Sequence, residues 1–288
     1  MKLLATMKRF SLLVAMIALA FTSALAQNQL VAQKETESSN KFFGQGTGMQ
    51  PGASGRQRQV LFDFRVTRRS NSLRIPMATQ RNVLSKVFRR YLTDDSRCNP
   101  EFDVNDTDHL RAARNAGQIV PSIVDMAQGS FTGPLRQETL YVISVSECNA
   151  SHAENFGSKR VAIFLGQQLI ADMDVEFRSS IVRKTDLDGD GVDELLMTTG
   201  DINQGVLIEI GALVDFQKGR LRVIEDFGTV IEDSCASGFT GSTSKASVIS
   251  SSNISPGRMP KLRIDNYEAG CRRVKRWRFV STGKMSDD

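Results

Sequence analysis

The sequence is poor in the side chains that many hydrolases and sugar-binding surfaces depend on. Its 288 residues include two histidines, His109 and His152, which leave little material for a histidine acid or base. One tryptophan and three tyrosines are few for a face that stacks on carbohydrate. The Gly-x-Ser-x-Gly motif of serine hydrolases is absent. These shortages argue against the commonest catalytic classes.

Long apolar runs are confined to the N-terminus. Residues 1–26 combine a basic start, an apolar stretch from Phe10 to Ala20 and a small-residue ending, which is the plan of a signal peptide cleaved after Ala26. No later segment approaches the roughly 18 apolar residues of a membrane span. No cysteine follows at position 27 for lipidation. We therefore expect a periplasmic or secreted protein without a transmembrane anchor in the mature chain.

Cysteine is scarce, and its number suits an oxidising compartment. An even count in an exported chain predicts two disulfides. The chain has no Cys-x-x-Cys, and His152, four residues after Cys148, would be a lone supporting ligand for zinc. Three pairings are open, and the sequential pairing is favoured because it closes the shorter loops. It joins Cys98 to Cys148 and Cys235 to Cys271.

The most informative segment is an acidic loop from Asp186 to Glu194. Acidic side chains occupy positions 1, 3, 5 and 9 of this loop, around a glycine at position 6. Calcium takes roughly six to eight oxygen ligands, and alternate side chains of a tight loop can face one centre. Four such acids would repel one another without a cation. The predicted Ca²⁺ ligands are the side chains of Asp186, Asp188, Asp190 and Glu194 and the carbonyl oxygen of Val192.

This loop is not an EF-hand, because position 12 holds Met197 where an EF-hand needs glutamate. Gly191 permits a sharp turn with positive φ, and Asp193 is expected to point outward. Asp and Gly also form ordinary surface turns without a metal, which is the alternative interpretation. Nothing in the loop supplies a nucleophile or a proton shuttle. A bound ion is therefore expected to brace a turn.

With short apolar segments on either side, the loop resembles the FG-GAP or VCBS class of integrin-alpha-like propeller repeats. The match consists of Asp186, Asp188, Asp190, Gly191, Glu194 and Leu195, in one copy over roughly residues 176–215. Glutamate stands where that family usually has aspartate. The resemblance implies a calcium ion in a strand-loop-strand setting, like part of a propeller blade. A closed propeller is not expected, because no blade repeat recurs along the chain.

The rest of the chain predicts an α+β fold made mainly of antiparallel sheet. A flexible leader over residues 27–59, rich in Gln, Ser, Gly and Lys, precedes a single exported domain over residues 60–284. Helical spacing or capping predicts short helices at 79–92, where Thr79 is the expected cap, at 106–116 and at 119–126. Strands are expected at 60–66, 139–145, 160–165, 168–173, 206–213, 220–224, 246–250, 261–264 and 274–280.

Basic residues gather in two parts of the chain. The formal net charge falls from +5 to +2 on removal of the signal peptide, which carries three basic residues and no acidic one. The clusters can face anionic polysaccharide, lipopolysaccharide or phospholipid headgroups, or they are solvated arginines on strand edges. Nucleic acid is a poor partner without a binding motif. The clusters are Arg56, Arg58, Arg65, Arg68, Arg69 and Arg74, and Arg272, Arg273, Lys275, Arg276 and Arg278.

Two short matches to catalytic sequence motifs leave an enzyme as the alternative interpretation of the chain. Ser242 to Lys245 fits Ser-x-x-Lys, but Ser38 to Lys41 fits it as well, and the companion motifs are missing. Asp172, Asp174 and Glu176 alternate and can supply the paired carboxylates of a glycosidase, the solvent face of a strand or one further calcium ligand.

The expected function is that of an exported, calcium-stabilised, disulfide-bonded binding or structural module without catalytic activity. The sequence does not identify its partner, and the candidates are an anionic cell-surface polysaccharide and another exported protein. The alternative is a calcium-dependent secreted hydrolase that acts on polysaccharide or phosphoester.

Overall fold

The computed structural model describes residues 58–66, 73–99, 109–148, 158–175, 180–252, 257–272 and 274–283. All of them belong to one compact unit, residues 55–288. The predicted signal peptide and nearly all of the predicted leader lie outside the described residues, as do His152 and Glu176.

The described strands form two antiparallel sheets, accompanied by two short α-helices and a 3-10 turn η1 (Asp95–Arg97). The four-stranded sheet has the order β2 (Ile119–Gly129), β3 (Glu138–Glu147), β4 (Ser158–Leu165), β5 (Gln168–Val175). The eight-stranded sheet contains β1 (Gln59–Asp63), β6 (Ser180–Thr185), β7 (Glu194–Asn203), β8 (Val206–Gln217), β9 (Arg220–Asp233), β10 (Thr243–Ser252), β11 (Lys261–Gly270) and β12 (Arg278–Thr282). Among the described residues no propeller of radial blades occurs.

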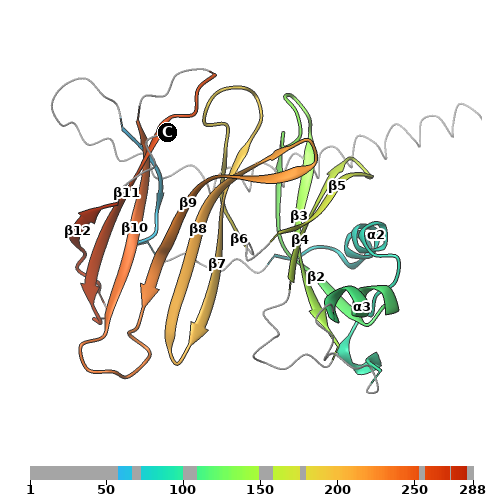
Figure 1. The fold of residues 1–288 in the computed structure, drawn as a ribbon, viewed down its shortest axis with the longest axis horizontal. Coiled ribbons are helices and arrows are strands. Elements are labelled where there is room, and N and C mark those ends of the chain that lie inside the picture. The colour runs from blue at the N-terminus through green and yellow to red at the C-terminus, as the bar shows by residue number, and fades with distance from the viewer. Residues whose placement is uncertain are drawn as a thin grey trace, which may run out of the picture. The chain divides into compact units, whose positions relative to one another are not determined.

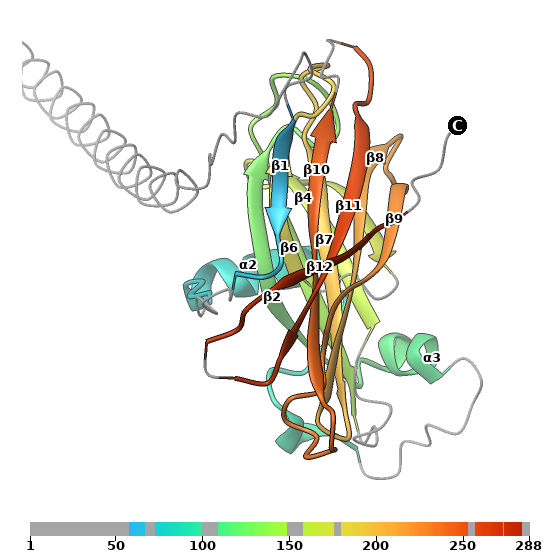
Figure 2. The same cartoon turned by 90° about the vertical axis from the view of Figure 1, so that its left-hand side faces the viewer.

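The eight-stranded sheet curls around its own apolar side chains. Strands β6 to β12 follow one another as a meander, whereas β1 joins out of sequence beside the second half of β10 (Figure 2). Arg183 of β6 donates hydrogen bonds to the carbonyl oxygens of Val60 and Leu61, at 3.5 and 2.5 Å. β1 is thus held by β10 on one side and by β6 on the other. Leu61, Leu196, Leu213, Ile249 and Ile264 contribute to this first core.

Three bulges in β9 assist the curl. Pairing with β8 skips Ile224, Phe227 and Val230, which recur every third residue. All three side chains belong to the first core or pack against it. A bulge bends and twists a strand and re-aims one side chain. Successive bulges therefore keep an apolar residue directed inward while the strand turns.

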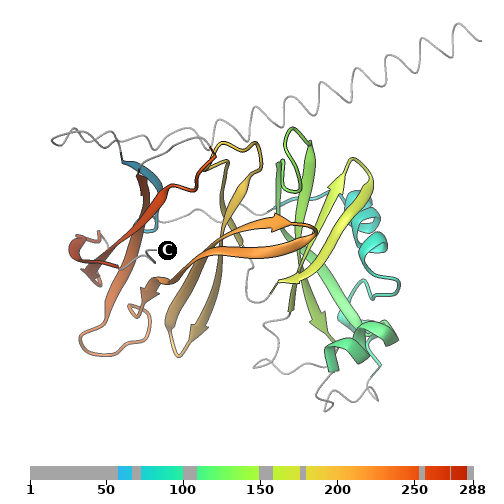
Figure 3. The same cartoon turned by 45° about the horizontal axis from the view of Figure 1, so that its top comes forward.

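The two sheets pack face to face through a second core. Alternate residues of each strand supply it, as expected for pleated strands. On β7, Leu195 and Met197 belong to this core while Leu196 belongs to the first. The hairpin of β8 and β9 extends toward β5 (Figure 3), and its Phe216 joins the same core.

Helices α2 (Met77–Val87) and α3 (His109–Ala116) cover the other face of the four-stranded sheet (Figure 1). Val83 and Leu84 of α2 and Ala113 of α3 pack with Tyr141 and Ile143 of β3 in a third core. None of the helices in the described ranges has the length and hydropathy that a membrane crossing needs.

Two predicted helices are confirmed with different bounds, and the third is wrong. Thr79 does not cap α2: the helix begins at Met77, after Pro76, and ends at Val87. Residues 119–126 form most of strand β2 instead of a helix. Their burial alternates, with Ile119, Pro121 and Ile123 buried, and β2 is an edge strand of its sheet, where proline is tolerated.

Both disulfides follow the sequential pairing favoured by the sequence. Cys98 is bonded to Cys148 and Cys235 to Cys271. No free cysteine remains among the described residues. Two disulfides indicate an extracellular domain, because cytosolic thiols are kept reduced.

A substitution at Gly211 in β8 tests how closely β8 packs against Val230 of β9 in the curled sheet. A Cβ atom at this position would lie 2.9 Å from Cγ1 of Val230, whereas one at Gly270 in β11 would meet no atom within 4 Å. We expect Gly211→Ala to lower the free energy of unfolding by about 1–3 kcal/mol through overpacking. Gly270→Ala is the matched control and should change it by less than about 0.5 kcal/mol. Urea denaturation measures both, and equal effects would contradict the packing argument.

Candidate metal centre

The acidic loop connects β6 to β7 and is closed by its own carboxylates. Asp186 accepts hydrogen bonds from the backbone N–H groups of Gly189 (2.7 Å) and Gly191 (3.0 Å). Both glycines have positive φ, 74° and 85°, which glycine adopts without steric cost. Asp188 and Asp190 accept from the N–H groups two residues later, as in Asx turns.

Three of the predicted ligands come together. One carboxylate oxygen from each of Asp186, Asp188 and Glu194 lies within 4.8 Å of the others. This spacing can hold a single cation that is bound through oxygen. The carboxylate of Asp190 is outside the group and accepts a hydrogen bond from the N–H of Val192 (2.7 Å). Ligation by Asp190 and by the carbonyl oxygen of Val192 stays a prediction.

Glu194 is the buried member of the group, with a relative exposure of 3%. Burial raises its pKa to about 7, and the charges of Asp188, Asp190 and Asp186 act in the same direction. A 2.7 Å hydrogen bond from the N–H of Leu187 opposes the shift. The site therefore lacks positive charge for its buried carboxylate.

Arg222 of β9 is one of the cations near the loop; another, Lys184, pairs with Asp193 at 3.2 Å. The Arg222 guanidinium forms an ion pair with Asp215 at 2.5 Å. The hydrogen bond to Asp215 raises the pKa of Arg222, and Glu194 and Asp188 add smaller electrostatic contributions. Because Asp215 already occupies this guanidinium, Arg222 neutralises the loop only in part.

The loop also fastens neighbouring segments. The N–H of Asp193 donates to the carbonyl oxygen of Ser130 (2.7 Å), and the Asp193 carboxylate accepts from the N–H of Ser130 (2.8 Å). The N–H of Gly257, before β11, donates to the carbonyl oxygen of Asp188 (2.5 Å). Asp193 thus points away from the grouped carboxylates, toward the β2–β3 turn. The sequence spacing gave no sign of these long-range partners.

Sequence reasoning also missed Glu138, which shapes the β2–β3 turn. Its buried carboxylate accepts hydrogen bonds from the N–H groups of Phe131 (2.7 Å) and Thr132 (2.8 Å) and from the Thr132 hydroxyl. Arg136 lies 3.7 Å from the same carboxylate. This arrangement holds the turn that Asp193 contacts. The one signal in the sequence was that Glu138 stands two residues before Leu140 and so shares its face of the strand. A charged side chain does not by itself show that it is buried.

The acidic row before the loop forms ion pairs rather than an acid–base pair. Arg160 of β4 contacts both Asp172 and Asp174 of β5, and Arg114 of α3 contacts Asp174 at 3.1 Å. Burial raises the pKa of Asp174, but the contacts with Arg114 and Arg160 outweigh it and leave the pKa below its ordinary value. A glycosidase general acid needs the opposite shift.

The Ser-x-x-Lys match does not form a catalytic pair. The Ser242 hydroxyl donates to the carbonyl oxygen of Phe239 (2.7 Å), while Lys245 pairs with Glu232 at 3.1 Å. Each side chain therefore has a different structural partner.

The ion-free site has a testable pH dependence. The pKa of Glu194 is higher in the folded protein than its ordinary value of 4.5, so its stabilising contribution is complete below pH 4.5 and is lost as the pH rises through about 7. The loss is on the order of 3 kcal/mol. We expect the chelator-treated protein to lose stability between pH 5 and pH 8 by urea denaturation. In Glu194→Gln this loss should be much smaller, and an equal loss would contradict the assignment.

The comparisons with known proteins leave this site to be interpreted from its own residues. No protein-family model matches the chain, and no match was found among curated proteins or among solved structures. The likeness of the loop to FG-GAP or VCBS repeats therefore stays a prediction based on the loop residues.

Proposed function

We propose that this protein is an exported binding or structural module without catalytic activity, stabilised by calcium and by its disulfides. The ion is held by the carboxylates of Asp186, Asp188, Asp190 and Glu194 and by the carbonyl oxygen of Val192. The observation that carries this proposal is the buried Glu194 carboxylate grouped with two aspartates.

The electrostatic argument begins with the cost of burying charge. A buried carboxylate needs a cation or several hydrogen-bond donors to stay ionised. Glu194 has one backbone donor, Leu187, and is surrounded by acids. A divalent cation at the grouped oxygens would remove both the desolvation cost and the mutual repulsion. It would also lower the pKa of Glu194 and fix the turn in place.

The chemistry of the ligands favours calcium. The candidate ligands are all oxygen atoms, which hard cations prefer, and no histidine or free cysteine is part of the group. Magnesium demands near-octahedral geometry and retains several waters, whereas calcium accepts irregular sets of carboxylates and carbonyls. A loop with two positive-φ glycines and several Asx turns suits the more tolerant ion.

The inferred role of the ion is mechanical. The loop, which is the β6–β7 connection, is bonded to the β2–β3 turn through Asp193 and Ser130. It is also bonded to the segment before β11 through Gly257. An ion that rigidifies the loop would therefore strengthen the contact between the two sheets. The alternative, a secreted hydrolase, has weaker support because Asp172 and Asp174 are both engaged by Arg160.

Thermal unfolding with and without calcium tests this proposal. One calcium site with a Kd of about 0.1 mM should stabilise the fold by about 2.7 kcal/mol when the free calcium concentration is about a hundred times the Kd. We expect the melting temperature of the oxidised protein to rise by several degrees when millimolar calcium replaces chelator. Asp188→Asn should abolish the rise.

Asp201→Asn is the matched control, because Asp201 is an exposed aspartate in β7 outside the grouped carboxylates. It should retain the full response to calcium. A melting temperature that does not depend on calcium in the unmodified protein would overturn the proposal.

A further inference from the structure

Three connections of the eight-stranded sheet lie at the same end of its strands, because every second turn of an antiparallel meander is at that end. They are the β7–β8 turn, the β9–β10 loop and the segment from β11 to β12. Each carries or adjoins one exposed apolar side chain: Ile202 is 69% exposed, Phe239 64% and Val274 75%. Single exposed apolar residues are ordinary, but here three neighbouring connections repeat the feature.

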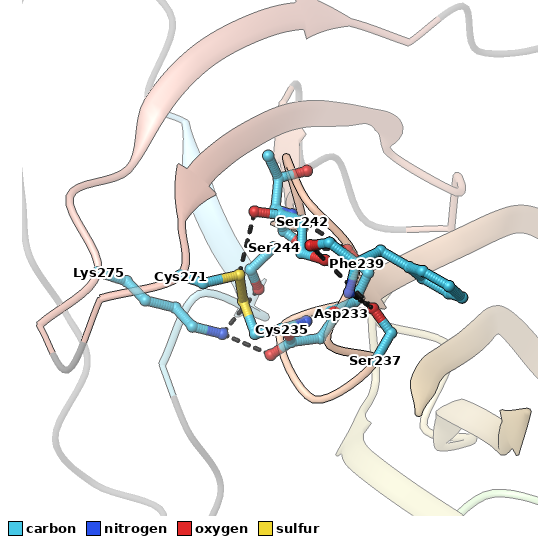
Figure 4. Close-up of a disulfide and its surroundings, with 10 residues drawn as sticks. Asp233, Cys235, Ser237, Phe239, Ser242, Ser244, Cys271 and Lys275 are labelled. Carbon is cyan, nitrogen blue, oxygen red and sulfur yellow. Dashed lines mark hydrogen bonds and ion pairs between the residues drawn. A yellow bond between two sulfur atoms is a disulfide. The ribbon is translucent and has the colours of Figure 1, made fainter. Parts of the chain in front are cut away.

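These connections are fastened to one another. The Cys235–Cys271 disulfide joins the β9–β10 loop to the segment after β11 (Figure 4). The ammonium group of Lys275 in that segment donates to Asp233 (2.5 Å) and Ser244 (2.7 Å) at the two ends of the loop. A Cβ atom on Gly205 of the β7–β8 turn would lie 2.7 Å from Cα of Ser237, so these backbones are in direct contact. The three connections form one platform.

The loop that carries Phe239 is also ordered internally. The Ser237 hydroxyl lies 3.2 Å from that of Ser242, and the N–H of Phe239 donates to the Ser237 hydroxyl at 3.3 Å. The Ser242 hydroxyl donates to the carbonyl oxygen of Phe239 (2.7 Å). Figure 4 shows the Phe239 ring pointing away from the disulfide and from these bonds. An aromatic side chain is thus presented on a fixed loop, which reduces the entropy lost on binding.

Positive charge adjoins the apolar side chains. Lys275 and Arg278 of the late basic cluster are paired with Asp233 and Glu268. Arg272 and Arg276 are exposed and have no ion pair with any of the described residues. Exposure alternates along this segment: Val274 and Arg276 are exposed, whereas Lys275 and Trp277 are partly buried. Apolar and cationic side chains therefore face solvent together.

We propose that this surface, formed by Ile202, Phe239, Val274, Arg272 and Arg276 and called the docking end below, binds an anionic lipid bilayer. Aromatic and aliphatic side chains at the tips of turns enter the boundary between headgroups and acyl chains. Arginine binds phosphate through a planar, bidentate fork. A bilayer is an extended surface that would contact the three connections together, and its phosphates would supply negative partners for Arg272 and Arg276.

Charge argues against a second copy of the chain as the occupant. In a twofold symmetric dimer the same patch faces itself, so Arg272 and Arg276 of one copy would approach those of the other. Like charges brought together in this way oppose association. An anionic surface is the partner that satisfies both kinds of side chain.

Vesicle sedimentation tests the docking end. The oxidised chain from Gln27 to Asp288 is suitable, because the predicted signal peptide would itself bind lipid. We expect binding to vesicles of equal parts phosphatidylglycerol and phosphatidylcholine at low salt, and little binding to phosphatidylcholine alone. The triple variant Ile202→Ser, Phe239→Ser, Val274→Ser should reduce the partition coefficient at least about tenfold. Arg272→Gln with Arg276→Gln should reduce it about thirtyfold.

Two substitutions at the opposite end are matched controls. Leu135, 96% exposed in the β2–β3 turn, and Arg220, exposed at the start of β9, lie outside the docking end. Leu135→Ser and Arg220→Gln should bind as the unmodified protein does, and circular dichroism should show every variant folded. No binding to anionic vesicles, or equal losses in the controls, would overturn the proposal. So would a dimer in sedimentation velocity that the triple variant disrupts without any lipid binding.

Discussion

The burial of Glu194 among other carboxylates is the constraint on which the rest of this structure depends. The residue begins β7, whose alternate side chains enter the first and second cores, so the turn before it must close at a fixed place. Closure brings Asp186 and Asp188 to the same point and leaves a buried negative charge with one backbone donor. The proposed divalent cation would resolve this conflict, whereas an ordinary surface turn would not create it.

The two ends of the eight-stranded sheet are held by different chemistry. At one end the acidic loop contacts Ser130 and Gly257 through hydrogen bonds whose geometry depends on the loop. At the other end the Cys235–Cys271 disulfide joins two connections covalently, which restricts the unfolded chain whatever the ion content. If the loop holds calcium as proposed, removal of the ion should loosen the first end before the second.

The sequence predicted local features better than long-range ones. Antiparallel strands and the position of the acidic loop follow from residue alternation and carboxylate spacing. The disulfide pairing was favoured over two other pairings because it closes the shorter loops. The helix predicted at residues 119–126 is wrong: Ile119, Pro121 and Ile123 alternate as in a strand, and an edge strand accepts proline. The bulges at Ile224, Phe227 and Val230 escaped notice because an apolar residue every third position matches neither a regular strand nor a full helical stripe.

Within the candidate site, too, the sequence predicted local features better than contacts between distant segments. The spacing of Asp186, Asp188 and Glu194 anticipated the grouped oxygens. It could not anticipate the bond between Asp193 and Ser130, because these two segments become neighbours only when the two sheets pack. The role of Glu138 is local to the β2–β3 turn, but a charged residue in a strand gives no sign that its carboxylate is buried.

Hydrogen–deuterium exchange of the oxidised protein, with chelator and then with millimolar calcium, tests the central claim most directly. If the ion braces the junction between the sheets, calcium should slow exchange at the N–H groups of Gly189 and Gly191 in the loop and also at those of Asp193 and Ser130, which join the loop to the β2–β3 turn. Exchange near the Cys235–Cys271 disulfide should change little. Identical exchange at the loop and at Ser130 under both conditions would contradict the account.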